Sequence, residues 1–500
     1  MYRHIVRSPD GAAIRAHALH LTLLLLLPAP TFAATFNVDV ETDSVDAIPG
    51  DGLCADAKGA CSLRAAIMES NSLAGHDAIT LAAGHFTLNI AGIGEDASAQ
   101  GDLDVTDDVA LSGAGSEASV IDGAAIDRVL DLLGGAPHTV RLEGLAVRNG
   151  FVGTSTWTGS FSGLGGVGIR VGAGTTLAMS HVDIRDNHSA NMFGAVAIDN
   201  AGCIEGDHVR IVGNTDLDEV GSASSVSGGI ETDGEDTCLV LDDSEISGNR
   251  GDKSGALHVD GGASVTLRRT LVADNVARFS GALELNQGDE VLLDNVTISG
   301  NAGDPGAILN DGGTHLILRN STVTGNHASA SNTNVGGIYD VHGGFGLTFL
   351  SNSILAGNGP GFIADDCKNV TSVGGGNLIG DSERCHVSTQ PSDLLDVDPG
   401  LGALGDNGGF TRTHLPGPNA IDHGVDGACL ADDQRGGARP LDGDDDGAAR
   451  CDIGAVEAGG LDLIFVDGFD SATRSHPSPH MHASNPRRAS APRTRRPQGT

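Results

Sequence analysis

The stretch that decides the fold is residues 246–308, which read ISGNRGDKSGALHVDGGASVTLRRTLVADNVARFSGALELNQGDEVLLDNVTISGNAGDPGAI. Its opening motif, Ile246-Ser-Gly-Asn249, returns as Val272-Ala-Asp-Asn275 and again as Ile298-Ser-Gly-Asn301, so each asparagine lies 26 residues after the previous one. A second motif, a glycine followed by alanine and an aliphatic residue, keeps the same period and begins at Gly255, Gly281 and Gly306. A fixed period of this length indicates a repeat architecture.

The repeat extends in both directions from this stretch. The same asparagine occurs at Asn187, Asn214, Asn326 and Asn358. Each unit also contains an alternating run such as Val265-Thr-Leu267 or Val291-Leu-Leu293, which is typical of a β-strand. The repeated region has no 3.6-residue period over ten residues, so helical repeats are excluded.

Three short strands per unit, separated by glycine and asparagine turns, cannot bury their apolar faces within one unit, but they can when coils stack on one another. Asparagine suits the turns because it tolerates the left-handed backbone conformation, and its amide can bond to its copy in the next coil. The chain has 74 glycines in 500 residues without the three-residue period of collagen. The sequence therefore predicts an all-β protein, a single-stranded parallel β-helix.

Two of the eight cysteines occupy equivalent positions in neighbouring coils. Cys203 lies 11 residues before Asn214, and Cys238 lies 11 residues before Asn249. Neighbouring parallel strands are about 4.8 Å apart, which is inside the Cα–Cα range of about 4.4–6.8 Å for a disulfide. The register therefore predicts a Cys203–Cys238 disulfide. No two cysteines have the CxxC spacing, so nothing favours a zinc site or a thioredoxin-like redox site.

A short helix is predicted before the repeat. Within residues 61–71, Leu63, Ala66, Ile67 and Ser70 recur at helical spacing. Such a helix would cover the first coil, whose strand edges would otherwise be open to aggregation.

The N-terminus has the features of an export signal. Arginines precede the apolar run Leu21–Leu27, and Thr31 and Ala33 supply the small residues of a cleavage site after residue 33. The run is far shorter than the about 20 apolar residues that span a bilayer. We therefore expect a signal peptide over residues 1–33, no membrane span after its removal, and an oxidising compartment that suits eight cysteines. The formal net charge of −37 opposes binding to nucleic acid and favours cations.

Two segments resemble known families. Residues 50–71, GDGLCADAKGACSLRAAIMESN, resemble the CSLREA-type segment that opens many secreted bacterial β-helix proteins, with Ala65 where that pattern has glutamate. Residues 398–457, with Asp398-Pro-Gly-Leu401 and Cys451-Asp-Ile-Gly-Ala-Val-Glu457, resemble the choice-of-anchor Q domain. Between them the repeat is similar to a pectin-lyase-like right-handed β-helix. Members of these families are exported or surface proteins, most of them without an assigned activity.

The resemblance implies a division of the chain. We expect an N-terminal cap over 34–79, β-helix repeats over 80–397 and the anchor-like domain over 398–460. Residues 464–470, IFVDGFD, look like the IFxDGFE ending of secreted gammaproteobacterial proteins, so 461–500 are expected to hold a sorting motif and a disordered basic tail. Closeness in sequence and the resemblance also imply three further disulfides, which are Cys54–Cys61, Cys367–Cys385 and Cys429–Cys451.

Acidic side chains form two predicted columns on the outside of the first strand of each coil. If Ile230, Leu257 and Leu283 point inward, the next residues, Glu231, His258 and Glu284, point outward in one column. Asp233, Asp260 and Asn286 form a second column, flanked by Asp199 and Asp311. Carboxylates about 4.8 Å apart favour a bridging Ca²⁺ or a raised pKa in one of them. The alternative is an acidic, solvated outer face.

If this face is catalytic, its composition suits acid–base hydrolysis better than lyase chemistry. A β-elimination of the pectate-lyase type needs a basic residue, and no arginine or lysine shares the predicted columns. The nearest are Lys253, just before the strand, and Arg170, which we place several coils away.

A calcium-binding turn is predicted near the C-terminus. Asp442, Asp444 and Asp446 have the DxDxDG order of a calcium loop, but position 12 is Ile453, so this is no EF-hand. A flexible acidic turn is the alternative. Residues 163–168 match GxGxxG but precede a strand pattern, and no P-loop occurs, so the sequence predicts no organic cofactor.

The sequence thus predicts an exported cell-surface or secreted protein that presents an extended ligand-contact face, with carbohydrate as the expected ligand and calcium as a stabiliser. The alternative is a polysaccharide-degrading enzyme, a lyase or a glycoside hydrolase, that uses Glu231, His258 and Glu284. The oligomeric state is left open.

Overall fold

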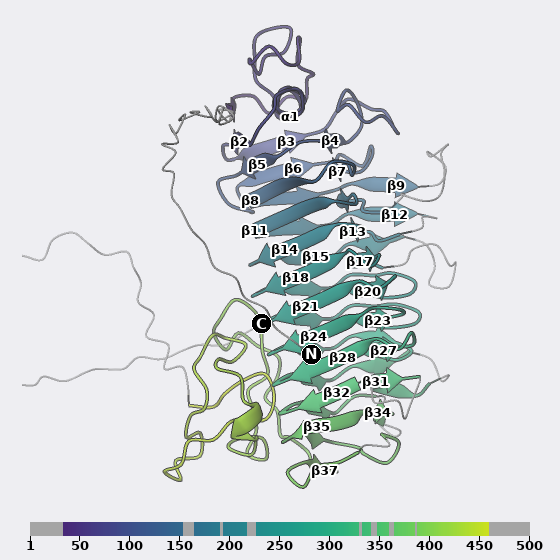
Figure 1. Cartoon of the computed structure of the whole chain (residues 1–500), viewed down its shortest axis with the longest axis vertical. Coiled ribbons are helices and arrows are strands. Elements are labelled where there is room, and N and C mark those ends of the chain that lie inside the picture. Colours follow the sequence, from purple (N-terminus) through teal and green to yellow (C-terminus); the bar gives the residue numbers. More distant parts are fainter. Residues whose placement is uncertain are drawn as a thin grey trace, which may run out of the picture. The chain divides into compact units, whose positions relative to one another are not determined.

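Parallel β-strands form successive coils along most of the chain in the computed structural model (Figure 1). The structure describes residues 34–153, 165–190, 194–217, 227–329, 333–341, 348–359, 365–385 and 388–459. The predicted signal peptide (1–33) and the predicted sorting motif and tail (461–500) lie outside the described residues. The coils form a right-handed parallel β-helix, which confirms the fold that the asparagine repeat predicts.

The first strand of each coil belongs to a ten-stranded parallel sheet, which we call the first sheet. In chain order, its strands are β4 (Leu103–Val105), β7 (Leu130–Leu132), β10 (Ile169–Val171), β13 (Ile198–Asn200), β17 (Ile230–Asp233), β20 (Leu257–Asp260), β23 (Leu283–Leu285), β27 (Ile308–Asn310), β31 (Val335–Asp340) and β34 (Asp365–Lys368).

The second and third strands of the coils belong to one 22-stranded sheet in the described part of the chain, because β8 and β11 each extend over 11 residues and serve both positions. The second stack consists of β1 (Thr35–Val38), β2 (Asp77–Leu81), β5 (Val109–Ser112), β8 (His138–Arg148), β11 (Thr175–Arg185), β14 (Cys203–Asp207), β18 (Cys238–Asp242), β21 (Ser264–Arg268), β24 (Glu290–Asp294), β28 (His315–Arg319), β32 (Thr348–Ser351) and β35 (Thr371–Gly375).

The third stack continues from the same two long strands. It consists of β3 (Gly84–Thr87), β6 (Ser119–Asp122), the second halves of β8 and β11, β15 (Arg210–Val212), β19 (Glu245–Ser247), β22 (Leu271–Ala273), β25 (Thr297–Ser299), β29 (Thr322–Thr324), β33 (Ile354–Ala356), β36 (Leu378–Ile379) and β37 (Leu394–Leu395). Short pairings at the following turn join β9 (Phe151–Gly153), β12 (His188–Ala190) and β16 (Thr215–Asp216), and separately β26 (Ala302–Gly303) and β30 (His327–Ala328).

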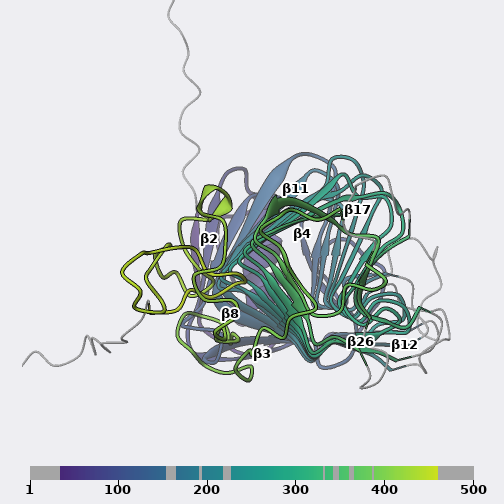
Figure 2. The same cartoon turned by 90° about the horizontal axis from the view of Figure 1, so that it is seen from below.

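The strands superpose when the coils are viewed along the stack, and their inward side chains form one continuous apolar core (Figure 2). Ile230, Leu257, Leu283 and Ile308 succeed one another in register, and each is fully buried. Since one inward residue serves each coil, every coil buries its neighbours' apolar faces, which is why the repeat needs stacking for stability.

The repeated asparagines form a buried row, the asparagine ladder, at the turn that follows the third stack. Its members are Asn187, Asn214, Asn249, Asn275, Asn301, Asn326 and Asn358, all fully buried. Each side-chain amide donates to the Oδ1 atom of the next member, as from Asn249 to Asn275 at 3.0 Å and from Asn275 to Asn301 at 2.9 Å. The ladder ends at Asp366, whose Oδ1 accepts both the backbone and side-chain N–H groups of Asn358.

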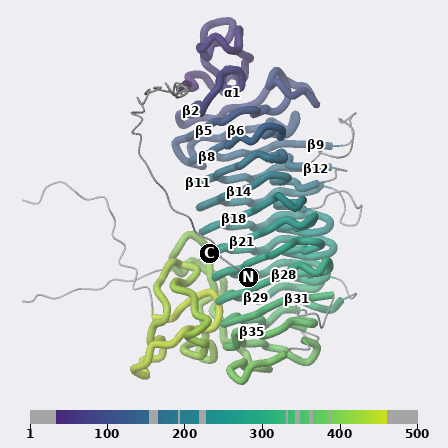
Figure 3. Tube along the Cα trace, in the orientation of Figure 1, coloured from purple at the N-terminus to yellow at the C-terminus, as the bar shows by residue number. Residues whose placement is uncertain are grey.

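The predicted helix is present as α1 (Leu63–Ser72), at the N-terminal end of the stack (Figure 3). Ser62 caps it, because its hydroxyl accepts from the N–H of Ala65 at 3.1 Å. The fully buried Arg64 pairs with Asp43. Its guanidinium also donates to the backbone oxygens of Ser98, Gly101 and Asp102. The helix is therefore tied both to the cap and to the loop that leads into β4.

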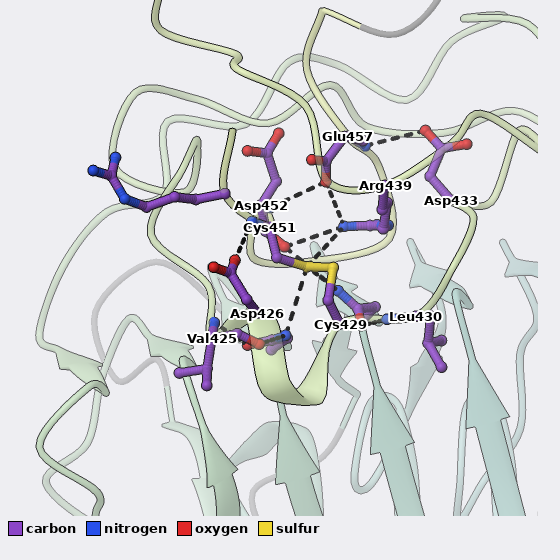
Figure 4. The surroundings of a disulfide bond; sticks show 12 residues. Val425, Asp426, Cys429, Leu430, Asp433, Arg439, Cys451, Asp452 and Glu457 are labelled. Atoms are coloured by element: carbon purple, nitrogen blue, oxygen red, sulfur yellow. Dashed lines mark hydrogen bonds and ion pairs between the residues drawn. A yellow bond between two sulfur atoms is a disulfide. The ribbon is translucent and has the colours of Figure 1, made fainter. Parts of the chain in front are cut away.

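Residues 398–459 pack against the third stack and the turn before it, and contain the 3₁₀ helix η1 (Asp426–Ala428). Fully buried Arg439 organises this segment beside the Cys429–Cys451 disulfide (Figure 4). Its guanidinium lies 2.9 Å from a carboxylate oxygen of Glu457 and donates to the backbone oxygen of Gly454 at 2.7 Å.

All four expected disulfides are present. They are Cys54–Cys61, Cys203–Cys238, Cys367–Cys385 and Cys429–Cys451. Cys203 and Cys238 are register partners of β14 and β18, with Cα atoms 4.5 Å apart, so the coil alignment that predicts this bond is confirmed. Among the described residues, no helix is long and apolar enough to cross a membrane.

Candidate functional site

The first sheet presents one outward side chain per coil at the residue after its first inward aliphatic residue. The strand register places Glu231 opposite His258 and His258 opposite Glu284, as the repeat predicts. The same position continues toward the N-terminus. We call the whole row the ionisable column, and it consists of Asp104, Asp131, Arg170, Asp199, Glu231, His258 and Glu284.

Two sequence-based placements are wrong. Asp199 lies in the ionisable column, opposite Glu231, and does not flank the second column. Arg170 lies opposite Asp199, so a basic residue does share the column. The error arises because the turn after the first strand varies in length. It comprises residues 201–202 in one coil and 234–237 in the next, so counting back from the asparagine repeat does not align these coils.

The second predicted column keeps its acidic character. Asp233 lies opposite Asp260, and the Asn286 side chain donates to a carboxylate oxygen of Asp260 at 3.4 Å. Asp311 follows the last residue of β27 and continues this row. Burial raises the pKa of Asp233, and the negative charge of Asp260 raises it further. A cation near this pair would relieve that repulsion.

His258 lies between two carboxylates without a hydrogen bond to either. Its Nδ1 is 3.7 Å from Glu231 Oε1, and its Nε2 is 4.0 Å from Glu284 Oε1. Both ring nitrogens are buried and have no hydrogen-bond partner, as is Oε2 of Glu284. Burial raises the pKa of Glu284, and burial together with the charge of Glu231 raises the pKa of Asp199 to about 7. Acids that exchange protons near neutral pH can act as general acids or bases.

The described structure covers most of this column. The side chain of His258 is 1% exposed, that of Glu284 11% and that of Glu231 14%. These side chains form a largely enclosed row of titratable groups, which is unlike the open face that the sequence suggests.

A tightly packed charged cluster lies at the N-terminal end of the column. Arg128 Nη1 lies 2.8 Å from an oxygen of Asp131 and 3.2 Å from one of Asp102, and Arg170 Nε donates to the other oxygen of Asp131 at 2.7 Å. Burial raises the pKa of Asp102 to about 7 and that of Asp104 to about 8. Sequence analysis missed this cluster. Its signal is the triplet with a charged residue between two aliphatic ones, Leu103-Asp-Val105 and Leu130-Asp-Leu132, which matches Ile169-Arg-Val171.

An open groove of about 510 Å³ lies on the outer face of the second stack, over β8, β11, β14 and β18. Its floor consists of two rows in register, Arg141–Ala178–Glu205–Val240 and Glu143–Ser180–Asp207–Asp242, and Arg269 also lines it. Four carboxylates, two guanidinium groups and a hydroxyl thus converge on one hollow. The charged outward positions of Val140-Arg-Leu-Glu143 and Ile204-Glu-Gly-Asp207 were the available sequence signal.

Two histidine rings stack next to this groove, directly after its second row. The ring centroids of His181 and His208 are 4.7 Å apart and their planes differ by 9°. Phe410 meets His208 edge-on at 4.7 Å between centroids. In the preceding coil, the register places Gly144 at the position of His181. Gly144 has no side chain to cover the ring, and His181 is exposed.

The predicted calcium turn has a different set of acidic neighbours. Asp422, Asp442 and Asp444 each place an oxygen within 4.8 Å of the others. Asp446 faces Arg450 at 3.1 Å instead, and this hydrogen bond lowers the pKa of Asp446. Backbone N–H groups of Gly443 and Asp444 donate to one oxygen of Asp422, so part of the loop is closed by the chain itself. Calcium binding here stays a prediction.

Comparison with known proteins adds the fold description. A family model described as "Right handed beta helix region" matches residues 228–375, which include the coils of Glu231, His258 and Glu284. The crystal structure of pectate lyase Pel9A is similar at 14% sequence identity with a TM-score of 0.37, and the match covers 86% of this chain and 98% of that chain. No curated protein sequence matches this chain.

Proposed function

We propose that this chain is an exported β-helix protein that binds a carbohydrate polymer in the groove over β8, β11, β14 and β18. The observation that carries the proposal is the exposed ring of His181 beside an open groove with carboxylates, guanidinium groups and a hydroxyl on its floor. Sugars combine apolar ring faces, which pack on flat side chains, with many hydroxyls that donate to carboxylates and accept from guanidinium groups.

A polymer fits this groove better than a single small molecule. The two floor rows repeat the same type of position on four consecutive coils. With about 4.8 Å between coils, the rows extend for roughly 14 Å. A chain of similar units laid along the stack would meet a similar row of polar groups at each step. The first sheet offers less contact, because its ionisable column is mostly enclosed.

Export is supported by two features of the chain. Residues 1–33 have the pattern of a signal peptide. The four disulfides suit an oxidising compartment. The formal net charge of −37 disfavours nucleic acid as a partner. A neutral polysaccharide, or an acidic one held through bound cations, is the ligand class that these charges favour.

The test is binding of the purified protein to a panel of neutral and acidic polysaccharides, with and without Ca²⁺, by affinity electrophoresis and calorimetry. His181→Ala should weaken binding about fivefold, because a ring-stacking contact contributes about 1 kcal/mol. Glu205→Gln should also weaken binding. Glu290→Gln alters an exposed glutamate of the same stack outside the groove and should leave binding unchanged. Binding that is unaffected by both groove variants would refute the proposal.

A second candidate is glycoside hydrolysis at the ionisable column, and His258 favours it. A buried imidazole between two carboxylates, all with unused hydrogen-bonding capacity, can move a proton once a substrate reorganises the site. Glu284, whose pKa burial raises, would act as the acid, and Glu231 as the base or nucleophile. Arg170 gives the column the basic residue that a lyase needs, but this side chain is already bonded to Asp131.

Product analysis separates the two candidates. If the protein is a hydrolase, incubation with its polysaccharide should yield reducing ends, and Glu284→Gln should abolish them without weakening binding in the groove. An unchanged polymer after prolonged incubation with a bound substrate would leave the binding role alone.

A further inference from the structure

We propose that Asp102, Asp104 and Asp131 form a binding site for a hard divalent cation of calcium's size, at the N-terminal end of the ionisable column. Asp104 is the outward residue of β4, Asp131 is its register partner in β7, and Asp102 directly precedes β4. This site is separate from the groove and from the acidic turn near Asp442.

The spacing of the three carboxylates fits a common ion. One oxygen from each lies within 4.8 Å of the others, and all three side chains are buried. Two ligands that each lie about 2.3–2.6 Å from a Ca²⁺ ion are at most about 5 Å apart. An all-oxygen set of carboxylates also matches the preference of hard cations over zinc or copper.

An unpartnered atom points independently to a ligand. Asp104 is fully buried, and its Oδ1 atom has no hydrogen-bond partner. Its other oxygen, Oδ2, accepts from the backbone N–H of Ser98 at 2.7 Å. A buried carboxylate oxygen without a donor is costly, because it has lost water and gained nothing in exchange. A cation beside Oδ1 would supply the missing partner.

The charges around the cluster leave room for two positive charges. The carboxylates of Asp102, Asp104, Asp127 and Asp131 face the guanidinium groups of Arg128 and Arg170. Four negative groups against two positive ones leave two negative charges uncompensated. The guanidinium groups bind Asp131 and one oxygen of Asp102, so the deficit lies beside Asp104. A single divalent cation balances it.

The backbone around the cluster is held in place by the helical cap. Arg64 donates to the backbone oxygen of Asp102 at 3.0 Å, and the side-chain amide of Asn71 donates to that of Asp104 at 2.7 Å. Both donors belong to α1, so the ligands are positioned before any ion binds. A bound cation would therefore fasten the cap and its loop to the first two coils of the first sheet.

The test uses the full-length protein with Asp442→Asn and Asp444→Asn, which silence the acidic turn near the C-terminus. After treatment with EDTA, this parent is titrated with Ca²⁺ in a calorimeter and melted with and without the ion. It should bind one Ca²⁺ and melt at a higher temperature when Ca²⁺ is present. Asp104→Asn should weaken binding by about tenfold or more. Asp260→Asn, which changes an outward aspartate of the second column, should leave the affinity unchanged.

Asp104→Asn carries a second readout with the opposite sign. Since it removes an uncompensated buried charge, it should raise the melting temperature in EDTA while it removes the gain from Ca²⁺. If this variant does not fold, Asp102→Asn serves the same comparison. The proposal is overturned if the silenced parent binds none of Ca²⁺, Mg²⁺ and Mn²⁺ at millimolar concentration, or if Asp104→Asn binds Ca²⁺ as tightly as the parent.

Discussion

Replacing Asn275 by alanine should lower the free energy of unfolding by about 4 kcal/mol. The side chain of Asn275 takes part in four hydrogen bonds. Its Oδ1 accepts from the backbone N–H and the side-chain amide of Asn249, at 3.0 Å each. Its Nδ2 donates to the backbone oxygen of Ile246 and to Oδ1 of Asn301, at 2.9 Å each. At about 1 kcal/mol net per bond, the loss comes to about 4 kcal/mol.

Burial makes this loss difficult to recover. Asn275 and its two ladder neighbours are fully buried, so water cannot reach the groups that alanine would leave without partners. The matched control is Asn286→Ala, which removes a partly exposed asparagine of the following coil that makes one long hydrogen bond, at 3.4 Å. This control should cost no more than about 0.5 kcal/mol.

Urea-induced unfolding gives the free energies, and amide hydrogen exchange gives the location. In Asn275→Ala, the backbone N–H of Asn249 loses its acceptor and should exchange much faster than in the unsubstituted protein. A cost below about 1 kcal/mol with unchanged exchange at Asn249 would refute the view that the ladder is a main stabilising element.

Three further outcomes are expected. Arg439→Met should cost about 3–5 kcal/mol in urea unfolding, because it leaves Glu457 buried without its partner, and a cost near zero would contradict this. Burial raises the pKa of Asp199 to about 7 and that of Asp366 to about 6, so each holds a proton in the folded chain where the unfolded chain, with a pKa of 3.8, is ionised. In EDTA the melting temperature should therefore fall as the pH rises from about 4 to 7, and a rise across this range would count against these shifts. Millimolar Ca²⁺ should raise the melting temperature, by an amount equivalent to about 2.7 kcal/mol at a hundredfold excess over Kd, and Asp444→Asn should remove part of the rise; identical curves in Ca²⁺ and EDTA would contradict calcium binding.

The sequence was sufficient for the fold because the asparagine ladder marks each coil at a fixed position. The ladder residues can be identified without a structure, since an asparagine after an aliphatic residue returns at every turn. Counting from Asn214 and Asn249 was enough to pair Cys203 with Cys238, because the segment between cysteine and asparagine has the same length in both coils.

The candidate site could be predicted only where the intervening turns keep their length. Glu231, His258 and Glu284 fall into one column as expected, whereas Asp199 was misplaced because its coil has a shorter turn after the first strand. The enclosure of His258 could not be predicted, because it depends on segments between strands that have no repeating pattern. The exposed ring of His181 likewise depends on the glycine that happens to precede it in register.

The asparagine ladder also gives the stack a direction. Each amide donates toward the C-terminal neighbour, so the amide dipoles align head to tail and add, as peptide dipoles do along an α-helix. The C-terminal end of the row thus gathers partial positive charge from the N–H groups of Asn358, and the acceptor-only carboxylate of Asp366 meets it there. Coils inserted within the row would lengthen this dipole and keep its sense, whereas extension beyond Asp366 would require an acidic residue at the new end. The protein can therefore gain coils by internal duplication more readily than by growth at its C-terminal end.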